Sequence, residues 1–270
     1  MKIIVTLKQV VDPLTPVSAL KVDGARRKIL GPPDTPPVIN GYDEQALEAA
    51  LRIKEEWRDG ECQVIALSAG TGFDLDVMKR AFAAGADELV LIEDTALDTW
   101  DVSFIVRTLA AAIKQLGGAD LVLCGRQASD WDNAQAPLML AELLGLPCLT
   151  LARRVEVKGQ HVQVERVLSD GIQVMEANLP AVVTVTSELG ELRYPPMRAR
   201  LQAAKRRPRT MTLKELGVTA TPPAAVEMLD LSLLQIERDC QFVKGASEAE
   251  AGRMLAELLI GGGFIKPQQA

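Results

Sequence analysis

The chain has 270 residues, of which 48% are hydrophobic and 24% charged, and its net charge at pH 7 is -6. This composition can bury a sizeable core, as one large domain or as one domain plus an appendage. No apolar run reaches the roughly 18 residues of a membrane span, and no leader precedes the first strand. We therefore expect a cytoplasmic protein without membrane insertion.

The cysteine and histidine content argues against a metal site and against nucleophilic catalysis. The cysteines, Cys62, Cys124, Cys148 and Cys240, are widely spaced, and His161 is the only histidine. We expect reduced, buried cysteines and no metal site. His161 lies in an alternating stretch around Lys158-Gly159 that predicts a hairpin strand, with the histidine facing solvent. Metal-dependent hydrolysis and Ser/His or Cys/His catalysis therefore lack their usual residues.

Strands and helices alternate over the first two thirds of the sequence. In chain order we predict strands at 2–7, 62–68, 88–93 and 121–124, helices at 43–56, 74–84 and 101–116, and a helix that opens at Pro137. This alternation is typical of repeated βαβ units, so we expect an α/β fold with a parallel, Rossmann-like sheet. Neither GxGxxG nor GxxxxGK[ST] occurs at these turns, which excludes the standard dinucleotide and P-loop motifs.

The most informative segment is 120–145, in which an apolar strand leads through an acidic and amide-rich loop into a helix. At the carboxyl end of a parallel strand, free N–H groups of the next helix favour a phosphate. Asp130 and Asp132 would repel phosphate and better suit ribose hydroxyls, a helix cap or amides. Phosphate binding would then fall to the backbone of 133–136 and the amide of Gln135. An ordinary capped turn remains the alternative.

After Leu149 the pattern changes to antiparallel hairpins. We predict pairing of 154–157 with 160–166, followed by a hairpin of 172–177 and 181–187. These strands would extend or cover the parallel sheet.

A basic arm follows the hairpins. No Asp or Glu occurs between Leu192 and Lys214, although the protein is acidic overall. Such an arm favours an acidic partner; a solvated mobile segment or an arm that contacts nucleic acid are the alternatives. Nucleic acid is disfavoured because the remaining surface would repel it. Residues 219–225 read as a linker, and 247–259 as a capped amphipathic helix that docks on its own domain or on another subunit.

Several segments share their order and spacing with one protein family. They are KIIVTLKQVVD, KVDGARRKI, NGYDEQALEAALRIKE, LSAG, AFAAGADE, DLVLCGRQASDWDNAQAP, VERVLSDG, LPAVVTVTSELGELRYPP and LKELGV. Together they resemble the beta subunit of electron-transfer flavoproteins over residues 1–218, and in outline over 219–270. The resemblance implies a nucleotide-binding domain at 1–218 and a C-terminal linker and helix at 219–270 that dock on an alpha subunit.

The function that this resemblance implies is electron carriage rather than enzyme catalysis. The alpha subunit of the heterodimer would bind most of a redox-active FAD, and this chain would hold AMP as a structural nucleotide. Electrons would pass from flavin dehydrogenases to a quinone oxidoreductase or another respiratory acceptor. Two alternatives stay open: an electron-bifurcating member with a second FAD in the AMP site, and a standalone adenine-nucleotide sensor. A nucleotidyl-transferring enzyme would need an SGGxD or HxGH motif, which the sequence lacks.

The resemblance also implies which residues act. The AMP site would consist of Thr6, Asn40, Gly41, Tyr42, Asp43, Ala69, Gly125, Arg126, Gln127, Ala128, Ser129, Asp130, Trp131, Asp132, Asn133, Ala134, Gln135 and Ala136. A docking loop near 191–202 would supply Arg193, Tyr194, Pro195, Pro196, Met197, Arg198 and Arg200, with Met197 in place of an anchoring leucine. Glu165 and Arg166 would approach the flavin. Ala136-Pro137 replaces a hydroxyl residue followed by glycine, so phosphate binding would depend on Gln135 and backbone N–H groups.

Overall fold

The structure is a computed structural model, and it describes residues 1–25, 27–219, 228–233 and 240–265. The chain divides into two compact units, Met1–Ser232 and Leu233–Ala270. Most of the linker predicted at 219–225 lies outside the described residues.

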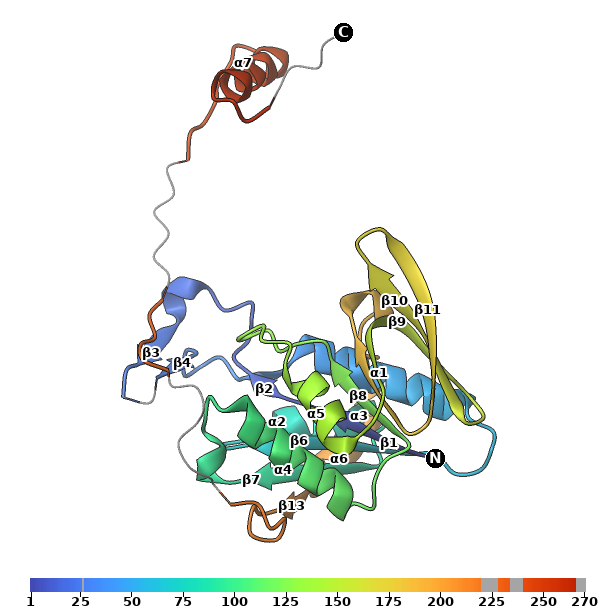
Figure 1. Cartoon of the computed structure of the whole chain (residues 1–270). Coiled ribbons are helices and arrows are strands. Elements are labelled where there is room, and N and C mark those ends of the chain that lie inside the picture. The colour runs from blue at the N-terminus through green and yellow to red at the C-terminus, as the bar shows by residue number, and fades with distance from the viewer. Residues whose placement is uncertain (26, 220–227, 234–239, 266–270) are drawn as a thin grey trace. The chain divides into compact units, whose positions relative to one another are not determined.

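The described part of the first unit is built on a nine-stranded sheet in the order β11-β10-β9-β12-β8-β1-β6-β7-β13 (Figure 1). The strands are β1 (Lys2–Thr6), β6 (Gln63–Gly70), β7 (Glu88–Glu93), β8 (Leu121–Gly125), β9 (Cys148–Lys158), β10 (His161–Leu168), β11 (Gly171–Asn178), β12 (Ala181–Val185) and β13 (Arg209–Met211). Neighbours from β9 to β13 in this order pair in parallel. β10 and β11 add an antiparallel edge, and the pairing of β9 with β10 confirms the first predicted hairpin. The expected α/β fold is confirmed.

Helices cover both faces of the parallel sheet. They are α1 (Gly41–Glu56), α2 (Leu75–Met78), α3 (Arg80–Ala84), α4 (Val102–Gln115), α5 (Ala136–Leu144) and α6 (Met197–Lys205), with 3-10 turns η1 (Val17–Ala19), η2 (Thr95–Leu97) and η3 (Ser187–Leu189). Ile3 and Val5 of β1 pack in one core with α1, α2, α3 and α6, whereas Ile4 packs in the other with α4 and α5. Burial on both faces explains why these strands are continuously apolar.

Between β1 and α1 the chain forms two small antiparallel pairs. β2 (Gln9–Val10) pairs with β5 (Val38–Ile39), and β3 (Lys21–Asp23) pairs with β4 (Lys28–Leu30). Lys28 forms an ion pair with Asp98, which ties the β3–β4 hairpin to the loop before α4.

The prediction of a second antiparallel hairpin, 172–177 with 181–187, is wrong. β12 lies inside the sheet and pairs in parallel with β8 and β9, while β11 pairs with β10. All residues of β12 are buried, as in a central strand, and sequence proximity does not reveal which strands neighbour it. The helix predicted at 74–84 is also divided, into α2 and α3, with Asp74 capping the first.

The basic arm is ordered. The loop predicted near 191–202 becomes helix α6 from Met197 onward, and Arg209–Met211 forms the edge strand β13. Residues of high helix propensity fill α6, and Pro195-Pro196 precede it, so local propensity favours a helix where the charge pattern had suggested a loop.

The cysteines differ in exposure. Cys124 is buried, Cys62 and Cys148 are half-buried, and Cys240 is exposed; all are free thiols. The expectation of buried cysteines is therefore wrong for Cys240. Among the described residues, no helix is long and apolar enough to cross a membrane.

The second unit contains helix α7 (Glu248–Gly261), which confirms the predicted tail helix. The Ser247 hydroxyl accepts a hydrogen bond from Glu250 N at 3.2 Å, and the Glu250 carboxylate accepts one from Ala246 N at 2.7 Å. Together these contacts cap the start of α7, as in a capping box, except that the carboxylate binds the N–H of the residue before the N-cap. Leu255 and Leu258 are 47% and 53% exposed.

Candidate functional site

The candidate site lies where the chain connections change faces of the sheet. The connection after β1 leads to α1 on one face, and the connection after the neighbouring β8 leads to α5 on the other. In α/β proteins, ligands bind at the carboxyl ends of strands that flank such a switch point. Thr6 ends β1, Gly125 ends β8, and Ala69 lies near the same end of β6. The structure thus brings the predicted strand-end residues to one edge.

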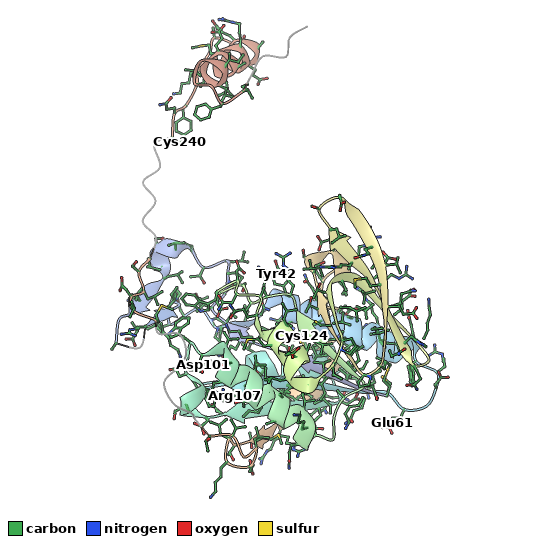
Figure 2. The ribbon with its side chains drawn as sticks, in the orientation of Figure 1. Tyr42, Glu61, Asp101, Arg107, Cys124 and Cys240 are labelled. Carbon is green, nitrogen blue, oxygen red and sulfur yellow. The ribbon has the colours of Figure 1, made fainter. Side chains whose placement is uncertain are left out.

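Asp43 joins the start of α1 to the segment that follows β1 and to the end of β8. Its Oδ2 accepts a hydrogen bond from Lys8 N at 2.8 Å, and its Oδ1 accepts one from Gly125 N at 3.1 Å. Burial raises the pKa of Asp43 to about 7, although hydrogen bonds from Lys8, Asn40 and Gly125 act in the opposite direction. A Cβ atom at position 125 would lie 2.6 Å from Tyr42 Cβ, so only glycine allows α1 to approach β8 this closely. Figure 2 labels Tyr42 and Cys124, which flank this junction.

Asn40 joins the same helix start to the loop after β8. Its Nδ2 donates to Gln127 O at 2.8 Å, and its Oδ1 accepts from Ser129 N at 3.1 Å. Asn40 occupies the N-cap position of α1, but its side chain makes no capping hydrogen bond. The amide, which is 1% exposed, therefore holds the loop and does not act as the cap that a lone asparagine would suggest.

The loop acids are paired within the chain. Asp130 Oδ2 lies 2.7 Å from Lys8 Nζ, and Asp132 Oδ1 accepts from Gln127 Nε2 at 2.7 Å. Pairing with Lys8 offsets one of the charges that would repel a phosphate. Asp132 and Ala134 adopt φ values of 49° and 53°, in the left-handed region that non-glycine residues rarely occupy. Backbone strain of this kind is concentrated at functional sites.

Two aromatic contacts brace the site. The Arg126 guanidinium lies 5.1 Å from the centre of the Tyr42 ring, a cation–π distance. The rings of Trp131 and Trp100 meet edge to face, with centroids 4.1 Å apart and planes at 85°. Sequence reasoning missed Lys8 and Trp100. Lys8 stands two positions beyond Thr6, but nothing in the local sequence around Trp100 indicates its partner.

The polar groups of the loop fit a polar ligand. Arg126 Nε and Ser129 Oγ are buried and have no hydrogen-bond partner among the described residues. Within that same part of the chain, the N–H groups of 133–135 and the exposed side chain of Gln135 also make no hydrogen bond. The first N–H groups of α5, which begins at Ala136, lack intrahelical acceptors. Such groups are the usual partners of a phosphate.

The cysteine at this edge of the sheet, Cys124, is not a reactive thiol. Burial raises the pKa of the Cys124 thiol to about 12, although a hydrogen bond with Thr6 lowers it, so the thiol is protonated and inert. In the described ranges, no group of three or more His, Cys, Asp or Glu side chains could hold a metal ion.

A hollow lies apart from this site, between α1 and the β9–β10 hairpin. Its volume is about 440 Å³, and it is lined by Arg52, Arg153, Arg154, Glu56, Glu156, Glu165, Glu188, Ala49, Val155 and Leu189. Each arginine already pairs with a glutamate, as in the contact of 2.7 Å between Arg153 and Glu165. This cleft therefore offers a ligand no free positive charge.

Some of the docking residues predicted from the sequence are exposed, and one is paired within the subunit. Tyr194 and Met197 are 83% and 66% exposed. Arg200 donates to the Tyr194 hydroxyl at 3.1 Å, and its guanidinium lies 5.9 Å from that ring. In contrast, Arg193 faces α1, where it binds Glu48 and Glu55.

The sequence is similar to those of known proteins. The profile described as "Electron transfer flavoprotein domain" matches residues 34–220. The chain is 34% identical over 212 residues to the electron transfer flavoprotein subunit beta of Megasphaera elsdenii, covering 76% of each chain. The chain belongs to the electron transfer flavoprotein beta subunits. This confirms the resemblance on which the expectations for AMP and the partners rest.

Two further relatives of this beta subunit cover similar lengths. The beta subunit of Mycobacterium tuberculosis (strain ATCC 25618 / H37Rv) is 31% identical over 227 residues, with 83% of this chain and 85% of the relative covered. The subunit CarD of the caffeyl-CoA reductase-Etf complex of Acetobacterium woodii is 36% identical over 197 residues, with 72% and 71% covered.

Proposed function

We propose that this beta subunit forms a heterodimer with an alpha subunit and carries electrons from flavin dehydrogenases to a quinone oxidoreductase or another respiratory acceptor. FAD, bound mostly by the alpha subunit, supplies the redox chemistry when present. The beta subunit contributes the binding geometry and has no catalytic residue. Family membership supports this role. Glu165 and Arg166, on the antiparallel edge of the sheet, would approach the flavin.

The nucleotide of the beta subunit is AMP, held as a structural ligand by the loop 125–136. The observation that carries this proposal is the bridge from Asn40 to Gln127 and Ser129, which fixes the loop at the switch point. The unpartnered Ser129 Oγ and the free N–H groups before α5 would bind the nucleotide, with the Gln135 amide on the phosphate. Lys8 reduces the repulsion from Asp130.

The alternative is a second FAD in the same site, in an electron-bifurcating complex. The relative CarD is named as a subunit of a caffeyl-CoA reductase-Etf complex, so a relative of this beta subunit can belong to an assembly with an enzyme. A free-standing nucleotide sensor is disfavoured because it would not need the docking surface or the tail helix. The nucleotide content of the heterodimer distinguishes AMP from FAD.

Donor dehydrogenases dock on the surface formed by Tyr194, Met197 and the flanking Arg198 and Arg200. A flexible, exposed methionine suits an apolar pocket, and the arginines suit acidic groups around it. Burial of a methionine side chain is worth about 1.5–3 kcal/mol. Met197→Ala should therefore speed dissociation of the complex by about tenfold or more.

Stopped-flow reduction of the heterodimer by a flavin dehydrogenase at several ionic strengths tests this docking role. We expect Met197→Ala to raise the apparent KM mainly through dissociation, and Arg198→Gln to slow association and flatten its salt dependence. Lys114→Gln is the matched control, because Lys114 is an exposed charge on α4, which covers the opposite face of the sheet. Wild-type rates for Met197→Ala and Arg198→Gln would remove this surface from the interface.

A further inference from the structure

A single buried carboxylate fastens the chain segment that leads to α6. Glu48 of α1 is 5% exposed. Its Oε2 accepts hydrogen bonds from Arg193 N at 3.1 Å and from Arg193 Nε at 2.9 Å, and its Oε1 accepts from Arg193 Nη2 at 3.1 Å. Arg52 Nε donates to the same carboxylate at 2.9 Å. Because the backbone and the side chain of Arg193 both take part, this contact fixes the position of the chain as well as that of the guanidinium.

The surrounding contacts make this attachment rigid. Arg52 Nη1 also donates to Leu189 O at 3.0 Å, so the chain is held on both sides of residue 191. Burial tends to raise the pKa of Glu48, but hydrogen bonds from Arg193 and Arg52 outweigh it, and the pKa is lowered. The carboxylate therefore stays ionised near neutral pH. A bidentate arginine–carboxylate pair adds geometric specificity that a point charge does not.

The other end of α6 is fastened independently. The Arg206 guanidinium lies 3.7 Å from the centre of the Phe82 ring and donates to Ala86 O at 3.1 Å. Lys79 Nζ donates to Ala204 O at 3.0 Å. Two of the basic residues, Arg193 and Arg206, are thus anchors on the body of the subunit.

Between these anchors the chain exposes three large hydrophobic side chains. Tyr194, Met197 and Leu201 are 83%, 66% and 61% exposed, and Met197 and Leu201 lie one helical turn apart. We infer that Glu48 and Arg193 are positioning residues, which hold this apolar surface in its docking conformation without touching the partner. This inference rests on the docking role proposed above. It changes the part played by Arg193 from a contact with the dehydrogenase to an internal support.

Without the contact between Glu48 and Arg193, the docking surface should be less preorganised, which lowers the affinity for the dehydrogenase. If only a fraction of free molecules presents the surface correctly, the apparent Kd rises by the inverse of that fraction. Glu48→Gln keeps the side-chain volume but removes the charge, so we expect the apparent KM for the dehydrogenase to rise by about tenfold. The kcat at saturation and the flavin spectrum should stay unchanged, because the surface is still complete once docked.

The experiment compares heterodimers that carry Glu48→Gln, Arg193→Gln or Met197→Ala. Glu56→Gln is the matched control: Glu56 lies on the same helix, is exposed, and makes no ion pair within the described part of the chain. Stopped-flow reduction gives KM and kcat, and hydrogen exchange of the free heterodimer reports on residues 191–205. We expect faster exchange there in both support variants and not in Met197→Ala or Glu56→Gln.

The outcomes separate the two proposals. If Met197→Ala raises KM but both support variants keep wild-type KM and exchange, the positioning role is wrong and the docking role stands. If Met197→Ala also keeps the wild-type KM, the docking role itself is wrong. Should Glu48→Gln fail to fold, Arg193→Gln decides, because Glu48 then keeps Arg52 as its partner.

Discussion

The close approach of α1 to β8 depends on the absence of a side chain at Gly125. A Cβ atom there would lie 2.5 Å from Asp43 Oδ1 and 2.7 Å from the Tyr42 carbonyl carbon. Gly125→Ala should lower the free energy of unfolding by about 1–3 kcal/mol, because the helix must move away, and it should reduce nucleotide occupancy. Gly24→Ala, between β3 and β4, is the control, since nothing lies within 4 Å of its added Cβ. Equal melting temperatures and nucleotide contents for the two variants would contradict this account.

Asp43 should make stability depend on pH. Its pKa is raised to about 7, chiefly by burial, so between about pH 4 and pH 7 the folded state binds more protons than the unfolded state. This contribution to stability is complete below the unfolded pKa and is lost as the pH rises through the folded value. Asp43→Asn removes the titration, at a cost of about 1–3 kcal/mol for one mispaired hydrogen bond.

The difference in the free energy of unfolding between wild type and Asp43→Asn tests this pH dependence. Urea unfolding at several pH values should show wild type losing its advantage over Asp43→Asn as the pH rises towards 8. The largest expected change is about 4 kcal/mol, from about 1.4 kcal/mol per pKa unit. Parallel pH curves for the two proteins would show that Asp43 does not titrate in this range.

At the scale of elements, the Trp100–Trp131 contact links the loop before α4 to the nucleotide loop. Edge-to-face pairs contribute about 0.5–1.5 kcal/mol beyond burial. Trp100→Ala should speed nucleotide release by about two- to tenfold and raise hydrogen exchange in 126–135. Trp57→Ala, at the far end of α1, should leave both unchanged. Unaltered release from the Trp100 variant would show that the ring pair does not stabilise the loop.

The sequence predicts individual helices and strands better than it predicts the order of the strands. Strands such as Lys2–Thr6 and helices such as Val102–Gln115 follow from local periodicity, so they were found within one or two residues. Strand order is not local, and Ala181–Val185 was therefore given the wrong neighbours. In the site, Gly125 and Asn40 were expected, but the hydrogen bond of Asp43 to Gly125 joins positions 82 residues apart and leaves no local signal.

For the whole molecule, the tail helix α7 should mediate assembly with the alpha subunit. Leu255 and Leu258 lie on one side of α7 and are exposed within the second unit. Replacing both with serine should weaken the heterodimer by at least about 100-fold, because each buried leucine contributes about 1.5–3 kcal/mol. Arg253→Ala with Glu257→Ala is the control, since this i,i+4 pair is exposed. Sedimentation of diluted heterodimer gives the Kd, and an unchanged Kd for the leucine variant would exclude this role.

The nucleotide content of the purified heterodimer tests the central claim most directly. The loop 125–136 is proposed to hold AMP beside an alpha subunit that binds FAD. Denaturation, followed by chromatographic identification of the released nucleotides, should yield one FAD and one AMP per heterodimer. Two FAD molecules and no AMP would contradict the simple carrier and favour bifurcation. One FAD with no second adenine nucleotide would contradict the site itself.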